Sequence, residues 1–286
     1  MRPPYVTSEF LRQFILSALA EDIGDGDHST LAAIPSNSIK KARLLIKEDG
    51  ILAGVELAEQ IFNSFDPSLK VDIKRADGTP VKKGEIAFTV EGSARSILTT
   101  ERLVLNCMQR MSAIATKTNR LSSLIAGTAA KILDTRKTTP NFRLLEKWAV
   151  LLGGGLNHRI GLFDMIMLKD NHIDMAGGIE RAIIRTKDYL RAGNRNLKIE
   201  IETRTLEEVD EVIRVGGVDV IMLDNMDLET LKAAVKRIDG KYKTEASGGI
   251  TEETIRDVAD CGVDFISVGA LTHSINSLDL SLKAFE

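Results

Sequence analysis

The chain has 286 residues, of which 43% are hydrophobic and 28% charged, a composition typical of a soluble globular protein with a sizeable core. Lysine and arginine number 38 against 41 aspartates and glutamates, so the net charge of −3 favours neither nucleic acid nor an anionic membrane as a partner. The longest apolar runs hold about five residues, far fewer than the ~20 that span a bilayer. Cys107 and Cys261 form no CxxC motif, so we expect neither disulfides nor a zinc cluster.

The amino-terminal sequence contains Pro3, Pro4 and Glu9, which interrupt any signal-peptide core, and we expect a cytoplasmic protein of metabolic type. Helical periodicity over residues 8–20 and 55–65, with strand-like runs at 42–46, 71–74 and 86–90, predicts a small α+β domain. Residues 96–125 contain no proline or glycine and predict one long helix, or two, that links this domain to the next.

From residue 131 onward, short apolar runs alternate with amphipathic helices. The runs lie at 132–133, 165–168, 199–201, 220–223, 242–246 and 265–268. Such repeats form either a doubly wound sheet or a β/α barrel. Polar, charged or glycine residues follow every run, and a barrel gathers all its strand ends around one mouth, whereas a doubly wound sheet uses only those near its switch point. The sequence therefore favours a barrel. Because six strands are fewer than the usual eight, this barrel is either open or completed by a strand from elsewhere.

Cationic side chains follow the first two predicted strands. Arg136 and Lys137 lie in a hydroxyl-rich turn that suits a multiply charged anion, although a solvated basic loop is the alternative. His158 and Arg159 follow a glycine triplet, which lacks the spacing of a nucleotide-binding loop. The more plausible role of the glycines is to let the backbone make a tight approach that brings His158 and Arg159 into the site. Lys169 ends the second strand, where the nearby cations favour anion binding over a Schiff base; pairing with the next aspartate is the alternative.

Carboxylates and glycines follow the later strands. Glu202 and Asp224 end successive strands and could share a Mg²⁺ that also holds substrate phosphates; ion pairing with the cations is a compatible alternative. The last two strands end in residues whose backbone N–H groups suit a phosphate, as barrels often provide: Ser247, Gly248, Gly249 and Gly269. These ends predict a substrate that carries phosphate.

Several runs together resemble the quinolinate phosphoribosyltransferase family, from about residue 19 to 274. The most specific are TRKTTP (135–140), GGGLNHRIGLFD (153–164) and LKDNH (168–172), and others are EDIGDGDHST, IEIET, VIMLDNM, EASGGI and ISVGALTHS. Asn141 stands where members often carry Gly, and Trp148 where Tyr is common. Asparagine tolerates positive φ and tryptophan keeps an aromatic body, so neither departure argues against activity.

The resemblance implies an α/β protein with an α+β sandwich domain over residues 1–110. An open β/α barrel of six or seven strands would follow over 111–273, and the tail 274–286 would pack back on the first domain. It also implies a homodimer with shared active sites and leaves open assembly into hexamers. The implied reaction converts quinolinate and phosphoribosyl pyrophosphate into nicotinate mononucleotide, pyrophosphate and CO2, with Mg²⁺, in NAD biosynthesis.

The resemblance also carries roles onto matching positions. Quinolinate would be bound by Arg102, Arg136, His158, Arg159 and Lys169. Phosphoribosyl pyrophosphate would be bound by Lys137, Glu202, Asp224, Ser247, Gly248, Gly249 and Gly269, with Glu202 and Asp224 on the Mg²⁺. The candidate catalytic residues are Lys137, His158 and Lys169, and the proton that quenches the carbanion left by CO2 comes from Lys137, His158 or water. Two alternatives remain: a relative of the molybdenum-transport protein ModD with another substrate, or a non-catalytic sensor of pyridine carboxylates.

Overall fold

A computed structural model describes residues 2–285, which divide into two compact units. The first unit holds the residues up to Asn119, Thr138–Gly154 and the residues from Leu271 on; the second holds Arg120–Lys137 and Gly155–Ala270. The sequence-based boundaries did not separate Thr138–Gly154 from the barrel. A side chain at Gly153 would overlap the carbonyl oxygen of Ala115, so the absence of a Cβ lets this segment pack closely within the first unit.

The first unit is built on a four-stranded antiparallel sheet in the order β12-β1-β5-β3, with a separate β2-β4 pair. Its elements are α1 (Ser8–Ile23), α2 (His28–Ala33), β1 (Ile39–Ile46), β2 (Gly50–Ile51), α3 (Val55–Phe65), β3 (Lys70–Ile73), β4 (Pro80–Val81), β5 (Ile86–Ser93), α4 (Ala94–Leu124), α5 (Arg143–Leu152) and β12 (Leu280–Phe285). The segment over 96–125 is one long helix, α4, whose last residues fall in the second unit. Strand β12, which the sequence analysis did not predict, pairs antiparallel with β1.

Helix α3 shows how the core of this unit forms. Its apolar residues recur at helical spacing, and one of them, Phe62, meets Phe88 of β5 edge-on with ring centroids 5.9 Å apart. The carboxylate of Asp77 accepts hydrogen bonds from the Val55 and Glu56 N–H groups at 2.8 and 3.1 Å, which satisfies donors in the first turn. The apolar face and this cap together fix where α3 begins and which side it buries.

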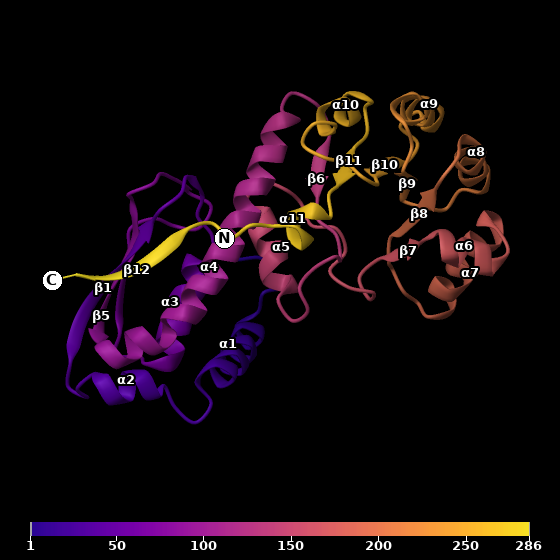
Figure 1. The fold of residues 1–286 in the computed structure, drawn as a ribbon. Helices are drawn as coiled ribbons and strands as arrows, with labels where there is room; N and C mark the ends of the chain where they lie inside the picture. The colour runs from indigo at the N-terminus through magenta and orange to yellow at the C-terminus, as the bar shows by residue number, and fades with distance from the viewer. Residues whose placement is uncertain (1, 286) are drawn as a thin grey trace. The chain divides into compact units, whose positions relative to one another are not determined.

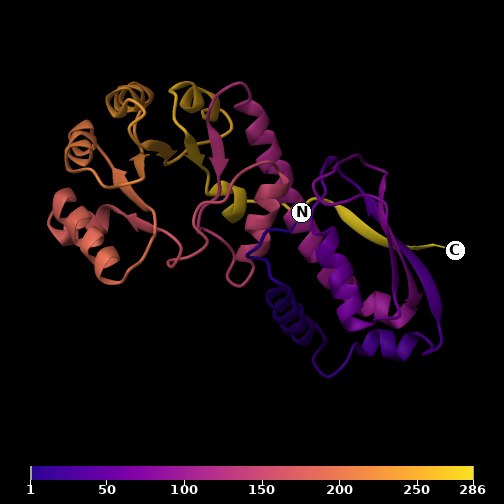
Figure 2. The same cartoon turned by 180° about the vertical axis from the view of Figure 1, so that it is seen from behind.

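The second unit is a six-stranded, all-parallel sheet in the order β6-β11-β10-β9-β8-β7. Its elements are β6 (Lys131–Leu133), β7 (Ile166–Leu168), α6 (Asp170–Ala176), α7 (Ile179–Ala192), β8 (Ile199–Thr203), α8 (Leu206–Val215), β9 (Val220–Asp224), α9 (Leu228–Ile238), β10 (Lys243–Ser247), α10 (Ile255–Asp260) and β11 (Phe265–Ser267). Helix α11 (Ala270–His273) begins at the last residue of this unit and continues in the first. Figures 1 and 2 show the strands along a curve with the helices outside it. The predicted fold class is confirmed.

The barrel is open between β6 and β7, the two edge strands of this sheet. Beyond β6, the chain returns after α5 to form an isolated parallel bridge between Leu133 and Leu156. The three residues that follow this bridge are Asn157, His158 and Arg159. The opening of the barrel is therefore partly filled by the segment that carries two of the predicted site residues.

Candidate active site

Every predicted site residue except Arg102 belongs to the second unit and lies at or just beyond a strand end. Glu202 is the penultimate residue of β8, and Asp224 and Ser247 are the last residues of β9 and β10. The others lie in the segments that follow the strands: Arg136, Lys137, His158, Arg159, Lys169, Gly248, Gly249 and Gly269. Because the strands are parallel, their carboxyl ends share one edge, which is where barrel enzymes hold their active sites.

Glu202 and Asp224 form a carboxylate pair at this edge. Glu202 is 8% exposed, and burial together with the negative charge of Asp224 raises the pKa of its carboxyl group. The positive charge of Lys169 acts in the opposite direction, so Lys169 lies close enough to interact with the pair. A cation bound between the two carboxylates would relieve their repulsion, and the donor set fits Mg²⁺, which takes one or two carboxylates in phosphate sites.

The carboxylate of Asp224 is oriented by its neighbour Asn225. The Asn225 side-chain amide donates to Asp224 Oδ2 at 2.6 Å, and its backbone N–H donates to the Ser247 carbonyl at 2.9 Å. A Cβ at Gly248 would overlap the Asn225 side chain, and Gly248 has φ of +98°. Glycine is therefore required here to place Asp224 beside the end of β10, in addition to any contact with phosphate.

Arg136 and Arg159 lie near each other. Burial, followed by the positive charge of Arg136, lowers the pKa of the Arg159 guanidinium, while Glu200 and Asp164 counteract this. Asp164 also accepts hydrogen bonds from the Ile160 and Gly161 N–H groups at 2.7 and 2.8 Å, which ties down the loop after Arg159. Two neighbouring guanidinium groups repel each other until an anion separates them, so the arrangement favours binding of a carboxylate or phosphate.

The segment that carries His158 is anchored to the end of β6 by Asp134. This carboxylate is fully buried and accepts hydrogen bonds from the His158 N–H at 2.9 Å and from the Asn157 side chain at 2.6 Å. Charge-assisted bonds of this kind are stronger than neutral ones. Asp134 therefore fixes the chain at the point where it enters the opening of the barrel.

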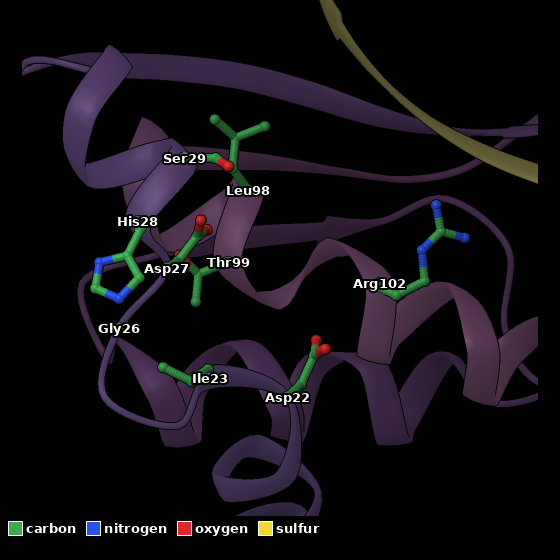
Figure 3. A pocket seen from close by; sticks show the side chains of 9 residues that line it. All are labelled: Asp22, Ile23, Gly26, Asp27, His28, Ser29, Leu98, Thr99 and Arg102. Atoms are coloured by element: carbon green, nitrogen blue, oxygen red, sulfur yellow. The ribbon is translucent and has the colours of Figure 1, made fainter.

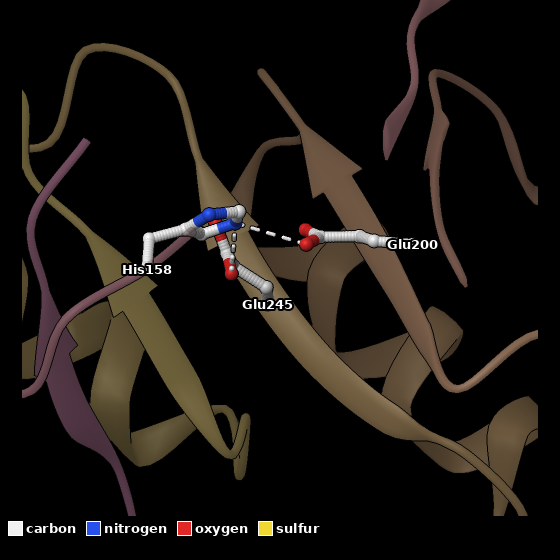
Figure 4. A group of neighbouring side chains, drawn as sticks. All are labelled: His158, Glu200 and Glu245. Atoms are coloured by element: carbon white, nitrogen blue, oxygen red, sulfur yellow. Dashed lines mark ion pairs between the residues drawn. The ribbon is translucent and has the colours of Figure 1, made fainter. Parts of the chain in front are cut away.

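The His158 ring points inward, toward two buried glutamates. Its Nε2 lies 2.9 Å from Glu200 Oε2 and 3.5 Å from Glu245 Oε2, as the dashed lines in Figure 4 show. Its Nδ1 accepts a hydrogen bond from the Arg159 N–H at 2.7 Å. Burial, with the negative charge of Glu200, raises the pKa of Glu245 well above its usual range.

The sequence analysis missed Asp134, Glu200 and Glu245 as functional candidates. The signal was present, because Glu200 and Glu245 lie within the runs 199–201 and 242–246 that are predicted as strands, and a barrel buries such strands. Acidic residues are almost never fully buried unless they are paired, so a glutamate inside such a run indicates a specific partner. The sequence did not show that both face the same histidine.

Arg102 lies in the first unit, on α4, with its side chain exposed. It lines a pocket of about 450 Å³ with residues from the end of α1 and the start of α2. Figure 3 shows all of them: Asp22, Ile23, Gly26, Asp27, His28, Ser29, Leu98, Thr99 and Arg102. A guanidinium at the wall of an open pocket is available to an acidic ligand.

The comparisons with known proteins agree with this geometry. Models of the amino- and carboxyl-terminal domains of quinolinate phosphoribosyl transferase match residues 27–112 and 114–283. This chain belongs to the quinolinate phosphoribosyltransferase family. It is 49% identical to the chloroplastic nicotinate-nucleotide pyrophosphorylase (carboxylating) of Arabidopsis thaliana, over 99% of this chain and 85% of that protein.

Solved structures of family members have the same fold. NadC from Streptococcus pyogenes superposes with a TM-score of 0.92 and 38% identity, covering 98% of this chain and 99% of that one. The nicotinate-nucleotide pyrophosphorylase from Francisella tularensis gives 0.92 and 40%, covering 98% of each. The predicted family, function and enzyme class, a decarboxylating phosphoribosyltransferase, are confirmed, and the ModD-like and sensor alternatives are not favoured. No helix within residues 2–285 combines the length and hydropathy needed to cross a membrane.

Proposed function

We propose that the chain transfers the phosphoribosyl group of phosphoribosyl pyrophosphate to quinolinate at the strand ends of the second unit, yielding nicotinate mononucleotide, pyrophosphate and CO2. The observation that supports the site most directly is that a group of cationic side chains and a group of carboxylates both lie there. Arg136 and Arg159 lie near each other, while Glu202 and Asp224 form a carboxylate pair that also interacts with Lys169. A dicarboxylate needs the first group, and a sugar pyrophosphate with its divalent cation needs the second.

In this proposal, Arg136, Arg159 and Lys169 bind the two carboxylates of quinolinate. Lys137 and the Glu202–Asp224 pair serve the pyrophosphate, and the 5′-phosphate is bound by Ser247, Gly248, Gly249 and Gly269. Mg²⁺ held by Glu202 and Asp224 would neutralise charge on the pyrophosphate leaving group. Gly248 and Gly249, with φ of +98° and +59°, leave the turn after β10 without Cβ atoms, so a phosphate can approach its N–H groups.

The protein supplies mainly orientation and charge. The cations hold quinolinate so that its ring nitrogen faces the carbon that pyrophosphate leaves, and this positioning lowers the barrier of a two-substrate step. The ring nitrogen becomes positively charged on attack, and its charge stabilises the carbanion formed when the adjacent carboxylate departs as CO2. Lys137, whose side chain is exposed at this edge, is the residue we propose to supply the proton, directly or through water.

Two variants test this division of the site. The Asp224→Asn variant should weaken Mg²⁺-dependent binding of phosphoribosyl pyrophosphate and leave binding of quinolinate alone nearly unchanged. Arg136→Ala should do the reverse, with at least about a tenfold loss of quinolinate affinity, because a charge-assisted hydrogen bond contributes roughly 1.5–3 kcal/mol. Calorimetry of each ligand, beside an assay for CO2 and nicotinate mononucleotide, gives both readouts.

The matched control is Arg191→Ala, because Arg191 is an exposed arginine that forms an ion pair with Asp188 of the same helix, α7, at 3.0 Å. It should retain both affinities and full turnover. Equal loss of quinolinate binding in Asp224→Asn and Arg136→Ala would contradict the division. Absence of nicotinate mononucleotide in the wild-type reaction would contradict the function itself.

We further propose that two chains form a homodimer in which Arg102 serves the barrel of the other chain, in the cytoplasm. An equal mixture of inactive Arg102→Ala and Lys169→Ala chains should then recover about a quarter of wild-type activity, because half of the dimers are mixed and each holds one complete site. Native mass spectrometry measures subunit exchange and also separates dimers from hexamers. Exchange without recovery would show that Arg102 does not act across the dimer.

A further inference from the structure

His158, Glu200 and Glu245 form a buried polar cluster inside the second unit. The two glutamates are 1% exposed and the histidine side chain 7%, and their facing atoms come from three separate segments of the barrel. Burying two carboxyl groups beside each other costs free energy unless their neighbours compensate for it. Such an arrangement therefore calls for an explanation beyond packing.

The hydrogen bond at Nδ1 determines which ring nitrogen carries the proton. Because Nδ1 accepts from the Arg159 N–H, its lone pair is used there, and the proton of the neutral ring resides on Nε2. That proton faces Glu200 and Glu245. Three such atoms could also surround a metal ion, but a metal would need the Nε2 lone pair, which the protonated nitrogen does not offer.

We propose that Glu200 and Glu245 are positioning residues that hold the His158 imidazole through Nε2, so that its Nδ1 fixes the backbone of Arg159 for binding quinolinate. This rests on the proposed function, since it assigns the purpose of the cluster to the anion site. It follows that the ring of His158 is not the acid that protonates the carbanion, because its Nδ1 accepts a hydrogen bond from the Arg159 N–H and its buried Nε2 faces the two glutamates at ion-pair distance.

The surroundings of the cluster are consistent with this role. The backbone N–H of His158 is held by Asp134, so ring and main chain are anchored separately. The guanidinium of Arg159 interacts favourably with Glu200, which balances part of the buried negative charge. Burial and the charge of Glu200 raise the pKa of Glu245, so this carboxyl group releases its proton less readily than an exposed glutamate does.

The first experiment reads the imidazole directly, without substrate. Protein labelled with ¹⁵N at its four histidines is studied by NMR, and the ring of His158 is assigned by its loss in His158→Gln. We expect a protonated Nε2 and an unprotonated Nδ1 in the wild type, and a changed ring signal in Glu245→Ala. An unprotonated Nε2, or one equivalent of bound Zn²⁺ in the purified protein, would overturn the proposal in favour of a metal site.

The second experiment separates positioning from stability. Glu245→Ala should raise KM for quinolinate by about tenfold, the loss expected for one misplaced charge-assisted contact, with KM for phosphoribosyl pyrophosphate within about twofold of wild type. Glu245→Gln, which keeps the size and polarity of the side chain, should recover most of that loss. Ile221→Ala is the control, because Ile221 is fully buried on β9 and its loss should reduce stability with both KM values unchanged.

Equal changes in both KM values, or an unchanged KM for quinolinate in Glu245→Ala, would overturn the assignment. If no variant and no wild-type protein turned over quinolinate, the proposed function would fail instead. The NMR result would remain interpretable in that case, because it needs neither substrate.

Discussion

Two buried glutamate sites, one in each unit, differ in whether the carboxylate oxygens have hydrogen-bond donors. In the first unit, Glu146 is fully buried and both of its oxygens have donors: Oε1 accepts from Arg110 Nε at 2.7 Å, and Oε2 accepts from the Thr139 N–H at 3.1 Å. In the second unit, Glu200 and Glu245 each keep one buried oxygen that makes no hydrogen bond within the described residues. One group is satisfied and the other is not.

This difference separates structural from functional burial. Arg110 also donates to the Thr139 hydroxyl and the Thr272 carbonyl, so it joins α4 to the start of the α5 segment and to α11, and every contact serves the fold. Buried polar groups are almost always hydrogen-bonded, and exceptions need a reason such as a role in a site. The group whose oxygens lack donors, Glu200 and Glu245, is the one beside the anion site. There the orientation of Arg159 offsets the free-energy cost of burying unsatisfied oxygens.

The largest expected effect tests the satisfied network. Arg110→Ala would leave the buried carboxylate of Glu146 without its cation, and breaking such a pair typically costs about 3–5 kcal/mol. Urea unfolding of the purified variant, followed by circular dichroism, measures the loss of stability. Activity per folded molecule should fall less than stability does.

The control for this prediction is Arg120→Ala. Arg120 pairs with Glu252 at 2.6 Å, but its side chain is 70% exposed, and exposed ion pairs contribute less than about 1 kcal/mol. If Arg110→Ala destabilised no more than this surface variant, the contrast between the two units would not hold.

The sequence predicted the barrel unit better than the sites within it. The six apolar runs from residue 131 on correspond to β6–β11, because buried parallel strands are nearly continuous apolar segments. Residues 55–65 match α3, whose apolar residues recur at helical spacing. Strand β12 escaped notice, since it pairs with β1 more than 200 residues earlier and local periodicity carries no information on such pairing.

The strand ends could be predicted as a site, but their internal contacts could not. Cations and carboxylates after successive strands indicate an anion and metal site from topology alone. Nothing in one sequence shows that His158 faces Glu245, or that Gly248 lies against Asn225, because these contacts depend on register between strands. The family resemblance indicated which substrate the site binds, and the structure shows which residues hold the site residues in place.

Substitutions at two glycines, one in each unit, test the same comparison and should have effects of intermediate size. In Gly153→Ala, the new methyl group would overlap the Ala115 carbonyl in the first unit, and overpacking of this kind costs about 1–3 kcal/mol of stability. In Gly248→Ala, the methyl group would displace Asn225, which orients Asp224, so affinity for phosphoribosyl pyrophosphate should fall with it. Calorimetry and urea unfolding of both variants test whether the first change acts mainly on stability and the second on binding; the same pattern in both would contradict this.

The smallest expected effect is the pH dependence of stability that Glu245, in the buried group of the second unit, contributes. Because the folded state raises the pKa of Glu245, it binds this proton more tightly than the unfolded state does. Between the ordinary and the raised pKa, the folded protein therefore holds more protons, and its stability falls as pH rises, by at most about 1.4 kcal/mol per pH unit. The Glu245→Gln variant has no titratable proton at position 245. Its free energy of unfolding should therefore rise relative to that of the wild type as pH increases from 5 to 7. Urea unfolding at intervals over this range measures the difference, with Ile221→Ala expected to run parallel to the wild type. A constant difference between Glu245→Gln and the wild type would mean that Glu245 is as easily ionised as an exposed glutamate, and the contrast between the two buried groups would then rest on hydrogen bonding alone.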